Sequence, residues 1–227
     1  GAAIDPNVIA EFEAMGLPMM QGYGMTECAP IIAVNRDRYS KAESVGPPMP
    51  GTDVKILSPD EFGVGEVICK GPSVMLGYYN DPEETERTIV NGWLHTGDYG
   101  YIDKEGYIYL MGRKKNVIIT RNGKNVFPEE IEYYLMRNEF ISEALVHGAP
   151  DSRTGDIIVK ADIVPNLLAV YDRLGENVKA EQLHDLIQTE IERVNDIMPS
   201  YKRVKRFSIR EKEFDKTTTH KIKRKQS

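Results

Sequence analysis

The sequence is poor in cysteine and has no long apolar run. Its two cysteines, Cys28 and Cys69, form neither a disulfide framework nor the close spacing of a metal site. No apolar stretch approaches the roughly 18 residues that a membrane-spanning helix needs, and the N-terminus has no signal-peptide pattern. With 41% hydrophobic residues and a mean hydropathy of −0.43, we expect a soluble globular protein of the reducing cytoplasm.

The chain also lacks an initiator methionine, internal repeats and low-complexity segments. It opens with GAAIDPNVIAEFEAMG and begins directly with what resembles the end of a strand and a capped helix. We therefore expect a piece of a longer protein. Its 227 residues are enough to bury a sizeable core, and we predict two domains.

Positive charge is unevenly distributed along the chain. The net charge is −6, but residues 201–227 hold eleven Lys and Arg against three Asp and Glu, which leaves this tail at +8 and the rest at −14. A basic tail indicates an anionic partner. Nucleic acid is one candidate, although the aromatic residues that single-strand binding favours are limited there to Tyr201 and Phe207. A solvated charged surface and a phosphate-bearing small molecule are the alternatives.

The first half of the chain predicts an α/β start followed by short strands. Pro6 opens a helix, and residues 17–24 are expected to form a short buried strand. Between residues 45 and 110, β-rich stretches alternate with Gly and Pro, which predicts a small barrel or sandwich. Asp81 followed by Pro82 marks the start of a helix inserted within it.

The pattern changes again after Gly112. Two β-rich stretches predict a hairpin, Pro128 opens a helix, and residues 179–198 predict an amphipathic helix. The apolar residues on one face of that helix are Leu183, Leu186, Ile187, Ile191, Val194 and Ile197. Residues 165–178 are predicted to be a surface loop. We expect a compact α+β module that begins near residues 113–115.

The segment QGYGMTEC, residues 21–28, combines residue types suited to a nucleotide. Glycines permit close backbone approach, Tyr23 offers a flat face, and Thr26 and Glu27 offer hard oxygen donors. Such a segment could hold a stacked base beside a metal-bound phosphate. Taken alone, a Gly-x-Gly turn is more often an ordinary loop. Four later segments change that balance: GYYNDPEET (77–85), GWLHTGDYG (92–100), GRKKNVIITRNGKNVFPEEIE (112–132) and TTTHKIKR (217–224).

In this order and spacing, the five segments resemble the adenylate-forming enzymes, and KNVFPEEIE is most similar to fatty acyl-CoA synthetases. The resemblance spans nearly the whole chain. It implies the C-terminal part of that mixed α/β and α+β fold. Residues 1–111 would be an α/β remnant and a small β-barrel subdomain of the large adenylation domain, and residues 112–227 a mobile α+β domain. The family's phosphate loop and most of its acyl pocket precede the tyrosine motif, and neither is present.

The resemblance implies a binding site for the adenine base. Tyr23 would stack on adenine, a contact worth roughly 1–3 kcal/mol, and the Gly22 backbone would reach its edge. Ala2, in a remnant Gly-Ala stretch, would lie against the base. Leu110 would pack near it.

The resemblance also implies contacts to the ribose and the phosphates. Asp98 in HTGD would accept hydrogen bonds from both ribose hydroxyls, and Arg113 would donate to the ribose from the other side. Thr26 would touch phosphate, and Glu27 would hold Mg²⁺ together with substrate phosphates. We expect His95 to be structural, because a lone histidine without a partner in sequence is more often a packing or surface residue.

The same resemblance makes Lys221 the catalytic residue of the first half-reaction. Attack of a carboxylate on the α-phosphate brings two anions together, and a positioned ammonium group relieves their repulsion in the transition state. His220 stands where the family usually has glycine. The neighbouring cations are predicted to form a solvated basic surface: Lys216, Lys223, Arg224 and Lys225.

Arg113, Lys114 and Lys115 resemble the family hinge. Lys115 would be the pivot about which the C-terminal domain rotates between an adenylating and a thioester-forming pose. In the second pose Gly123 would line the pantetheine tunnel, although a hairpin turn alone also calls for glycine.

From these residues we expect the C-terminal part of an ATP- and Mg²⁺-dependent fatty acyl-CoA synthetase, inactive as an isolated fragment. The substrates implied are a fatty acid, ATP and CoA. Neither nucleic acid nor a transmembrane segment is expected, and peripheral membrane contact stays open. Two alternatives remain: an acyl-AMP ligase that loads a carrier protein, and a non-catalytic nucleotide-binding module.

Overall fold

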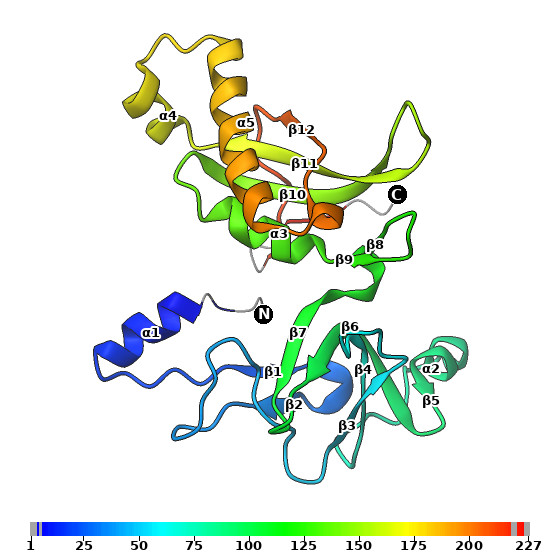
Figure 1. The fold of residues 1–227 in the computed structure, drawn as a ribbon. Coiled ribbons are helices and arrows are strands. Elements are labelled where there is room, and N and C mark those ends of the chain that lie inside the picture. Colours follow the sequence, from blue (N-terminus) through cyan, green and yellow to red (C-terminus); the bar gives the residue numbers. More distant parts are fainter. Residues whose placement is uncertain (1–3, 5, 219–221, 225–227) are drawn as a thin grey trace. The chain divides into compact units, whose positions relative to one another are not determined.

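The computed structural model describes residues 4, 6–218 and 222–224. The chain separates into two compact units, Gly1–Lys115 (unit 1) and Asn116–Ser227 (unit 2). In Figure 1 the colours of unit 1 run from blue to green and those of unit 2 from green to red. Mixed helices and several separate sheets confirm the predicted fold class.

Unit 1 is built mainly of antiparallel strands. Helix α1 (Pro6–Ala14) precedes a short pair, β1 (Gly22–Gly24) and β2 (Ile31–Val34). A second sheet has the strand order β3-β4-β6-β5, with β7 paired to β6. Its strands are β3 (Asp53–Leu57), β4 (Gly65–Lys70), β5 (Ile89–Val90), β6 (Trp93–Ile102) and β7 (Ile108–Arg113).

The core of unit 1 joins its two sheets. Along β6, buried side chains alternate with half-buried ones, which is typical of a strand that packs one face on a core. The buried cluster consists of Tyr23, Cys28, Ile32, Ala33, Val45, Val67, Cys69, Leu94 and Ile108. Because these residues come from both sheets, the two sheets form one packed body.

Helix α2 (Pro82–Thr88) confirms the predicted helix start. Asp81 Oδ1 accepts a hydrogen bond from the backbone N–H of Glu84 at 3.0 Å and so satisfies one of the unpaired donors of the first turn. Pro82 occupies the first helical position, where its missing N–H leaves nothing unpaired. The capping residues read from the sequence therefore fix this boundary.

Unit 2 is a three-stranded sheet with helices packed against it. Strand β10 (Ile141–Pro150) pairs antiparallel with β11 (Ile157–Pro165), which pairs parallel with β12 (Arg206–Ile209). The other elements are the hairpin of β8 (Ile118–Ile119) and β9 (Asn125–Val126), α3 (Pro128–Met136), α4 (Leu167–Leu174) and α5 (Ala180–Ile197). Figure 1 shows α3 and α5 beside the sheet, and all three contribute to one buried core.

Helix α5 confirms the predicted amphipathic helix except at its last residue. Its apolar face is buried or half-buried at Leu183, Leu186, Ile187, Ile191 and Val194. Ile197 is exposed, because the helix ends there and the next residue, Met198, fills the core instead. No helix in the described ranges is long and apolar enough to cross a bilayer.

The expected surface loop at residues 165–178 is wrong, because it contains α4. Val170 is completely buried in the core of unit 2 and holds the segment against the sheet. The helix ends at Gly175, whose φ of +88° suits glycine. One buried residue among exposed ones is a weak sequence signal, which is why the pattern reads as a loop.

The strand expected over residues 17–24 is also wrong for most of its length. Only Gly22–Gly24 form a strand, which pairs with β2. Leu17 and Met20 are exposed. An apolar run predicts burial only where another element covers it, and in the described part of the chain nothing covers these two side chains.

We expect Leu135→Ala to destabilise unit 2 by about 2–5 kcal/mol, because Leu135 is completely buried and its truncation leaves a cavity. Leu168→Ala on α4 is the control, since Leu168 is 78% exposed; it should cost less than about 0.5 kcal/mol. Urea unfolding followed by circular dichroism measures both. The single tryptophan, Trp93, belongs to unit 1 and reports separately on that unit. Equal losses for the two variants would contradict the core assignment.

Candidate functional site

The cross-strand pair of Asp98 and Arg113 forms the centre of the candidate site. Asp98 on β6 stands opposite Arg113 on β7, and Arg113 Nε contacts Asp98 Oδ1 at 2.9 Å. Arg113 Nη1 also donates to the carbonyl of Thr96 at 3.3 Å. The Asp98 side chain is 11% exposed and that of Arg113 is 50% exposed. A nearly buried carboxylate is therefore paired with a guanidinium that reaches solvent.

Tyr23 brings a third strand to the same carboxylate. Its hydroxyl donates to Asp98 Oδ2 at 2.6 Å, so each oxygen of Asp98 has a partner. Tyr23 is 8% exposed and belongs to the core of unit 1. Burial and the neighbouring Asp98 charge raise the pKa of Tyr23 well above its ordinary value. The phenol is consequently a hydrogen-bond donor at neutral pH.

The backbone before Asp98 is fixed by Thr96. The buried Thr96 hydroxyl donates to the carbonyl of Val67 at 2.6 Å and accepts from Asp98 N at 3.1 Å. Between them Gly97 has a φ of +68°, a conformation that residues with a side chain disfavour. The TGD triplet therefore needs all three residue types to aim the Asp98 carboxylate at its partners.

Glu27 lies on the 3₁₀ turn Thr26–Cys28, which carries the predicted phosphate and magnesium ligands. Its Oε1 accepts from the Tyr78 hydroxyl at 2.9 Å, and its carbonyl accepts from Met75 N at 2.9 Å. Within the described ranges, no three His, Cys, Asp or Glu side chains gather as a metal site. A magnesium ion at Glu27 would therefore need the phosphate oxygens of a bound substrate as further ligands.

Gly22 and Leu110 lie on the strands that also carry Tyr23 and Arg113. Gly22 precedes Tyr23 on β1, and a Cβ at this position would lie 3.4 Å from the carbonyl oxygen of Ala33. Leu110 on β7 is half-buried and packs on the core of unit 1. Both positions stay predicted contacts of the base.

An ion-pair network of Glu66, Lys114 and His95 lies beside Asp98 and was not predicted from the sequence. Glu66 on β4 accepts from Lys114 Nζ at 2.8 Å, and its other oxygen accepts from Gly97 N at 3.3 Å. His95 Nδ1 lies 3.3 Å from Glu66, a partner that the sequence did not indicate, and its structural role stays a prediction. Burial works to raise the pKa of Glu66, but Lys114 and His95 outweigh it, so the pKa lies below its ordinary value. Lys114 follows Glu66 by 48 residues, and no local pattern connects them.

The remaining predicted residues lie at the unit boundary, in unit 2 or outside the described residues. Lys115 is exposed and is the last residue of unit 1. Gly123 lies in the turn between β8 and β9 with a φ of +71°, and its N–H donates to the carbonyl of Thr120 at 2.9 Å. This turn by itself requires glycine, so the predicted tunnel contact stays a prediction. Ala2 and Lys221 lie outside the described residues.

The solvated basic surface predicted for the C-terminal cations is wrong for two of them. Arg224 Nη2 donates to both oxygens of Glu132 at 2.7 and 2.6 Å, and its side chain is only 24% exposed. Lys216 forms an ion pair with Glu143. Lys223 is exposed, as predicted, and Lys225 lies outside the described residues.

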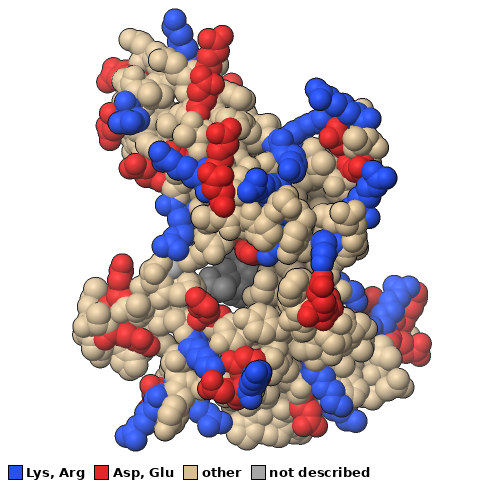
Figure 2. Space-filling model, in the orientation of Figure 1, with Lys and Arg blue, Asp and Glu red and all other residues tan. Residues whose placement is uncertain are grey.

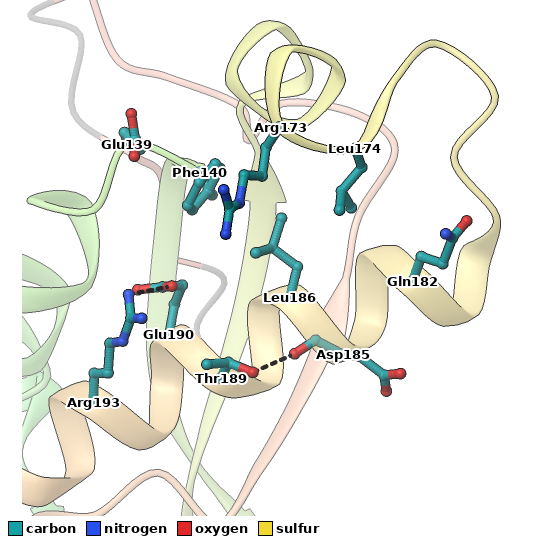
Figure 3. A pocket seen from close by; sticks show the side chains of 10 residues that line it. All are labelled: Glu139, Phe140, Arg173, Leu174, Gln182, Asp185, Leu186, Thr189, Glu190 and Arg193. Atoms are coloured by element: carbon teal, nitrogen blue, oxygen red, sulfur yellow. Dashed lines mark hydrogen bonds and ion pairs between the residues drawn. The ribbon is translucent and has the colours of Figure 1, made fainter.

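A cavity of about 590 Å³ lies in unit 2 between α4, α5 and the segment before β10. Figure 3 shows Arg173 reaching from α4 over Phe140 and Leu186. Glu190 on its wall is already paired with Arg193 at 2.7 Å. No predicted site residue of the described ranges lines this cavity, and we assign it no ligand.

Two family matches cover most of the chain. Residues 1–79 match the family described as AMP-binding enzyme, and residues 115–227 match the AMP-binding enzyme C-terminal domain. The long-chain-fatty-acid–CoA ligase of Bacillus subtilis (strain 168) is 42% identical over 171 residues, which are 72% of this chain and 30% of that protein. The 2-succinylbenzoate–CoA ligase of Enterococcus faecalis is 38% identical over 168 residues, 70% of this chain and 34% of that protein.

A solved structure agrees with these matches. O-succinylbenzoate coenzyme A synthetase from Bacillus subtilis, in complex with ATP and magnesium ion, has a TM-score of 0.77 and 30% identity over 98% of this chain and 44% of that one. The chain belongs to the AMP-binding, adenylate-forming enzymes. It spans 30% and 34% of the length of the two curated ligases.

We expect Tyr23→Phe to destabilise unit 1 by about 1–3 kcal/mol, because it removes a donor from the buried Asp98 carboxylate. Tyr39→Phe is the control, since Tyr39 is exposed. The raised pKa of Tyr23 means that its stabilisation is fully present below pH 10, its ordinary pKa, and is lost as the pH rises beyond. Urea unfolding followed by Trp93 fluorescence at pH 7 tests the loss. An unchanged midpoint for Tyr23→Phe would refute a stabilising role of this hydrogen bond.

Proposed function

We propose that the chain is the C-terminal part of an ATP-dependent acyl-CoA ligase. In the first half-reaction the carboxylate of the acid attacks the α-phosphate of ATP, which forms acyl-AMP and releases pyrophosphate. In the second, the thiol of CoA attacks the acyl carbon and AMP leaves. The observation that carries the proposal is the Asp98 carboxylate held by Tyr23 and Arg113, at the positions where the motifs predict a nucleotide.

Asp98 and Arg113 would hold the ribose. An ionised carboxylate accepts about four hydrogen bonds, so Asp98 can serve Tyr23, Arg113 and ligand hydroxyls together. Arg113, half exposed, can extend a second donor toward the same sugar. The two oxygens are already oriented before a ligand arrives, which lowers the entropy lost on binding.

Thr26, Glu27 and Lys221 would act on the phosphates. The Thr26 hydroxyl would donate to a phosphate oxygen, and Glu27, whose Oε1 accepts from the Tyr78 hydroxyl, would hold the magnesium ion that enters with ATP. Lys221 approaches the α-phosphate and the attacking carboxylate and relieves their repulsion. These three side chains all belong to this chain. Oxygens of the triphosphate would supply further ligands of the magnesium ion.

A fatty acid is the acyl substrate that we propose. The support is the identity of 42% to a long-chain-fatty-acid–CoA ligase, against 38% to a 2-succinylbenzoate–CoA ligase. A carrier-protein phosphopantetheine in place of CoA is the alternative acceptor. Because the chain spans only a part of each relative, we further propose that it does not complete the reaction alone.

The domain roles follow the same proposal. Residues 1–111 would belong to the adenylation domain and residues 112–227 to the mobile domain, with the hinge at residues 113–115. The boundary between the compact units after Lys115 supports this division. Gly123 would then line the pantetheine tunnel during thioester formation.

Pairing of the C-terminal cations weighs against nucleic acid as the anionic partner. Lys202 contacts Glu130 at 2.6 Å and Arg206 contacts Asp151 at 3.0 Å, in addition to the pairs of Lys216 and Arg224. On the face drawn in Figure 2, basic and acidic side chains are interspersed on each unit. A phosphate-bearing small molecule needs only a few oriented donors and fits this surface better.

We expect Asp98→Asn in the complete ligase to raise the KM for ATP at least tenfold, a loss of about 1.4 kcal/mol or more, because an amide presents one acceptor oxygen where the carboxylate presents two. Asp53→Asn on β3 is the matched control, since Asp53 is exposed, and its KM should not change. Thermal melts of both variants check folding. An unchanged KM for a folded Asp98→Asn would remove the ribose role and with it the main support of the proposal.

We expect Lys221→Ala in the complete ligase to slow adenylation by about 10²–10³-fold, because the charge that it neutralises develops in that step. Consumption of supplied acyl-AMP by CoA should stay close to the wild-type rate. Lys223→Ala is the matched control from the same segment. Pyrophosphate exchange and single-turnover thioester formation measure the two half-reactions. Equal loss in both would show that Lys221 supports the structure or a shared step.

A further inference from the structure

Backbone contacts join the residues on either side of segment 217–221, the stretch of sequence that contains Lys221, and we call these contacts the base of the segment. Lys216 and Ile222 form an antiparallel bridge, and Lys223 N donates to the carbonyl of Asp215 at 2.7 Å. The residues on either side of the segment are therefore held next to each other. The contacts that attach this base to the rest of unit 2 therefore set the positions of the residues that flank the segment.

Arg224 attaches one side of the base to α3 and β10. Its Nη2 donates to both carboxylate oxygens of Glu132, and its Nη1 donates to the carbonyl of Val146 at 2.7 Å. Glu132 is buried and also accepts from Val146 N at 2.6 Å. The planar guanidinium thus donates at the same time to a carboxylate and to a backbone carbonyl that already have fixed positions. A lysine ammonium on a flexible side chain could not form this set of hydrogen bonds.

Lys216 attaches the other side of the base. Its ammonium pairs with the buried carboxylate of Glu143. The other oxygen of Glu143 accepts from Phe214 N at 2.8 Å, and Phe214 itself is buried. Glu143 on β10 is therefore the second buried acid, and it holds Phe214 and Lys216, which precede the segment.

Two buried acids that each hold a cation of one short segment are unusual for a surface loop. Glutamate is rarely buried unless it is paired, because removal of its charge from water is costly. Lys223 lies between the two anchors in the sequence, is exposed, and its side chain forms no hydrogen bond or ion pair with another described residue. The described cations that flank the segment therefore divide into two that pair with buried acids, Lys216 and Arg224, and an exposed one, Lys223.

We propose that Arg224 and Lys216 are positioning residues that fix the base of segment 217–221 on unit 2 and thereby place Lys221 for adenylation. Glu132 and Glu143 are the buried carboxylates that hold them. This inference rests on the function proposed for Lys221. The anchors act on Lys221 through the backbone and do not touch the substrate.

Arg224→Gln tests the anchor, and Lys223→Gln is its matched control, because both remove one positive charge from the same segment. Amide hydrogen exchange on this chain gives the first readout. The amide of Lys223 should exchange at least tenfold faster in Arg224→Gln and within twofold of wild type in Lys223→Gln. The amide of Ile163, in the core strand β11, is the internal reference for global unfolding. Unchanged exchange at Lys223 in Arg224→Gln would overturn the proposal.

Half-reaction kinetics in the complete ligase give the second readout. Arg224→Gln should lower the rate constant of acyl-AMP formation at least tenfold with little change in the KM for ATP, and leave CoA attack on supplied acyl-AMP unchanged. Lys223→Gln should alter neither step beyond twofold. Equal loss in both half-reactions, or none in either, would contradict positioning of Lys221.

Arg224→Lys covers the case in which Arg224→Gln does not fold. It keeps the charge but replaces the planar guanidinium by a single ammonium. Its adenylation rate should therefore lie between those of wild type and Arg224→Gln, and its Lys223 amide should exchange faster than in wild type and slower than in Arg224→Gln. If Arg224→Gln does not fold, Arg224→Lys should still show slower adenylation and faster Lys223 exchange than wild type. Wild-type values in both readouts would overturn the proposal. If Lys221→Ala leaves adenylation intact, the proposed function of Lys221 fails, whereas the exchange data decide the anchor independently.

Discussion

The buried carboxylate of Asp98 is the constraint on which the candidate site depends. A carboxylate that is 11% exposed must be paired with donors, or its burial costs several kcal/mol. Tyr23 from β1 and Arg113 from β7 supply those donors at 2.6 and 2.9 Å. Because the three groups lie on three strands, the pairing also holds the small β1–β2 sheet against the larger one. The group proposed to bind the ribose is therefore part of the core of unit 1.

Unit 2 uses the same device to fix its C-terminal segment. Burial raises the pKa of Glu132, and the positive charge of Arg224 opposes that effect by stabilising the ionised carboxylate. Arg224 follows Glu132 by 92 residues, and Lys216 is held in the same way by Glu143. In both units buried acids join distant parts of the sequence. Ion pairs therefore hold Asp98 in unit 1 and Lys216 and Arg224 in unit 2, in addition to apolar packing.

Local signals were sufficient to predict many helices and strands. Asp81 and Pro82 predict the start of α2 because a cap acts within one turn, and the helical spacing of apolar residues predicts α5. Asp98 and Arg113 were predicted to contact a ribose from two sides; their direct ion pair was not predicted, and the ribose contact stays a prediction. Predictions failed where burial depends on remote elements. The segment 165–178 contains α4, whose residue Val170 is buried in the core, and two of the cations predicted to be solvated form ion pairs with buried acids.

The sequence by itself determined the positions of caps and turns, the amphipathic face of α5 and the order of motifs that identifies an adenylate-forming enzyme. These depend on residue types and spacing, which are properties of the chain alone. Only the tertiary structure decided that Tyr23 is buried against Asp98, that Glu66 joins Lys114, and that Glu132 holds Arg224. Ion pairs across tens of residues form between any suitable charges that the fold brings within about 4 Å. Strand register and packing decide which charges meet, and no local sequence pattern specifies either of them.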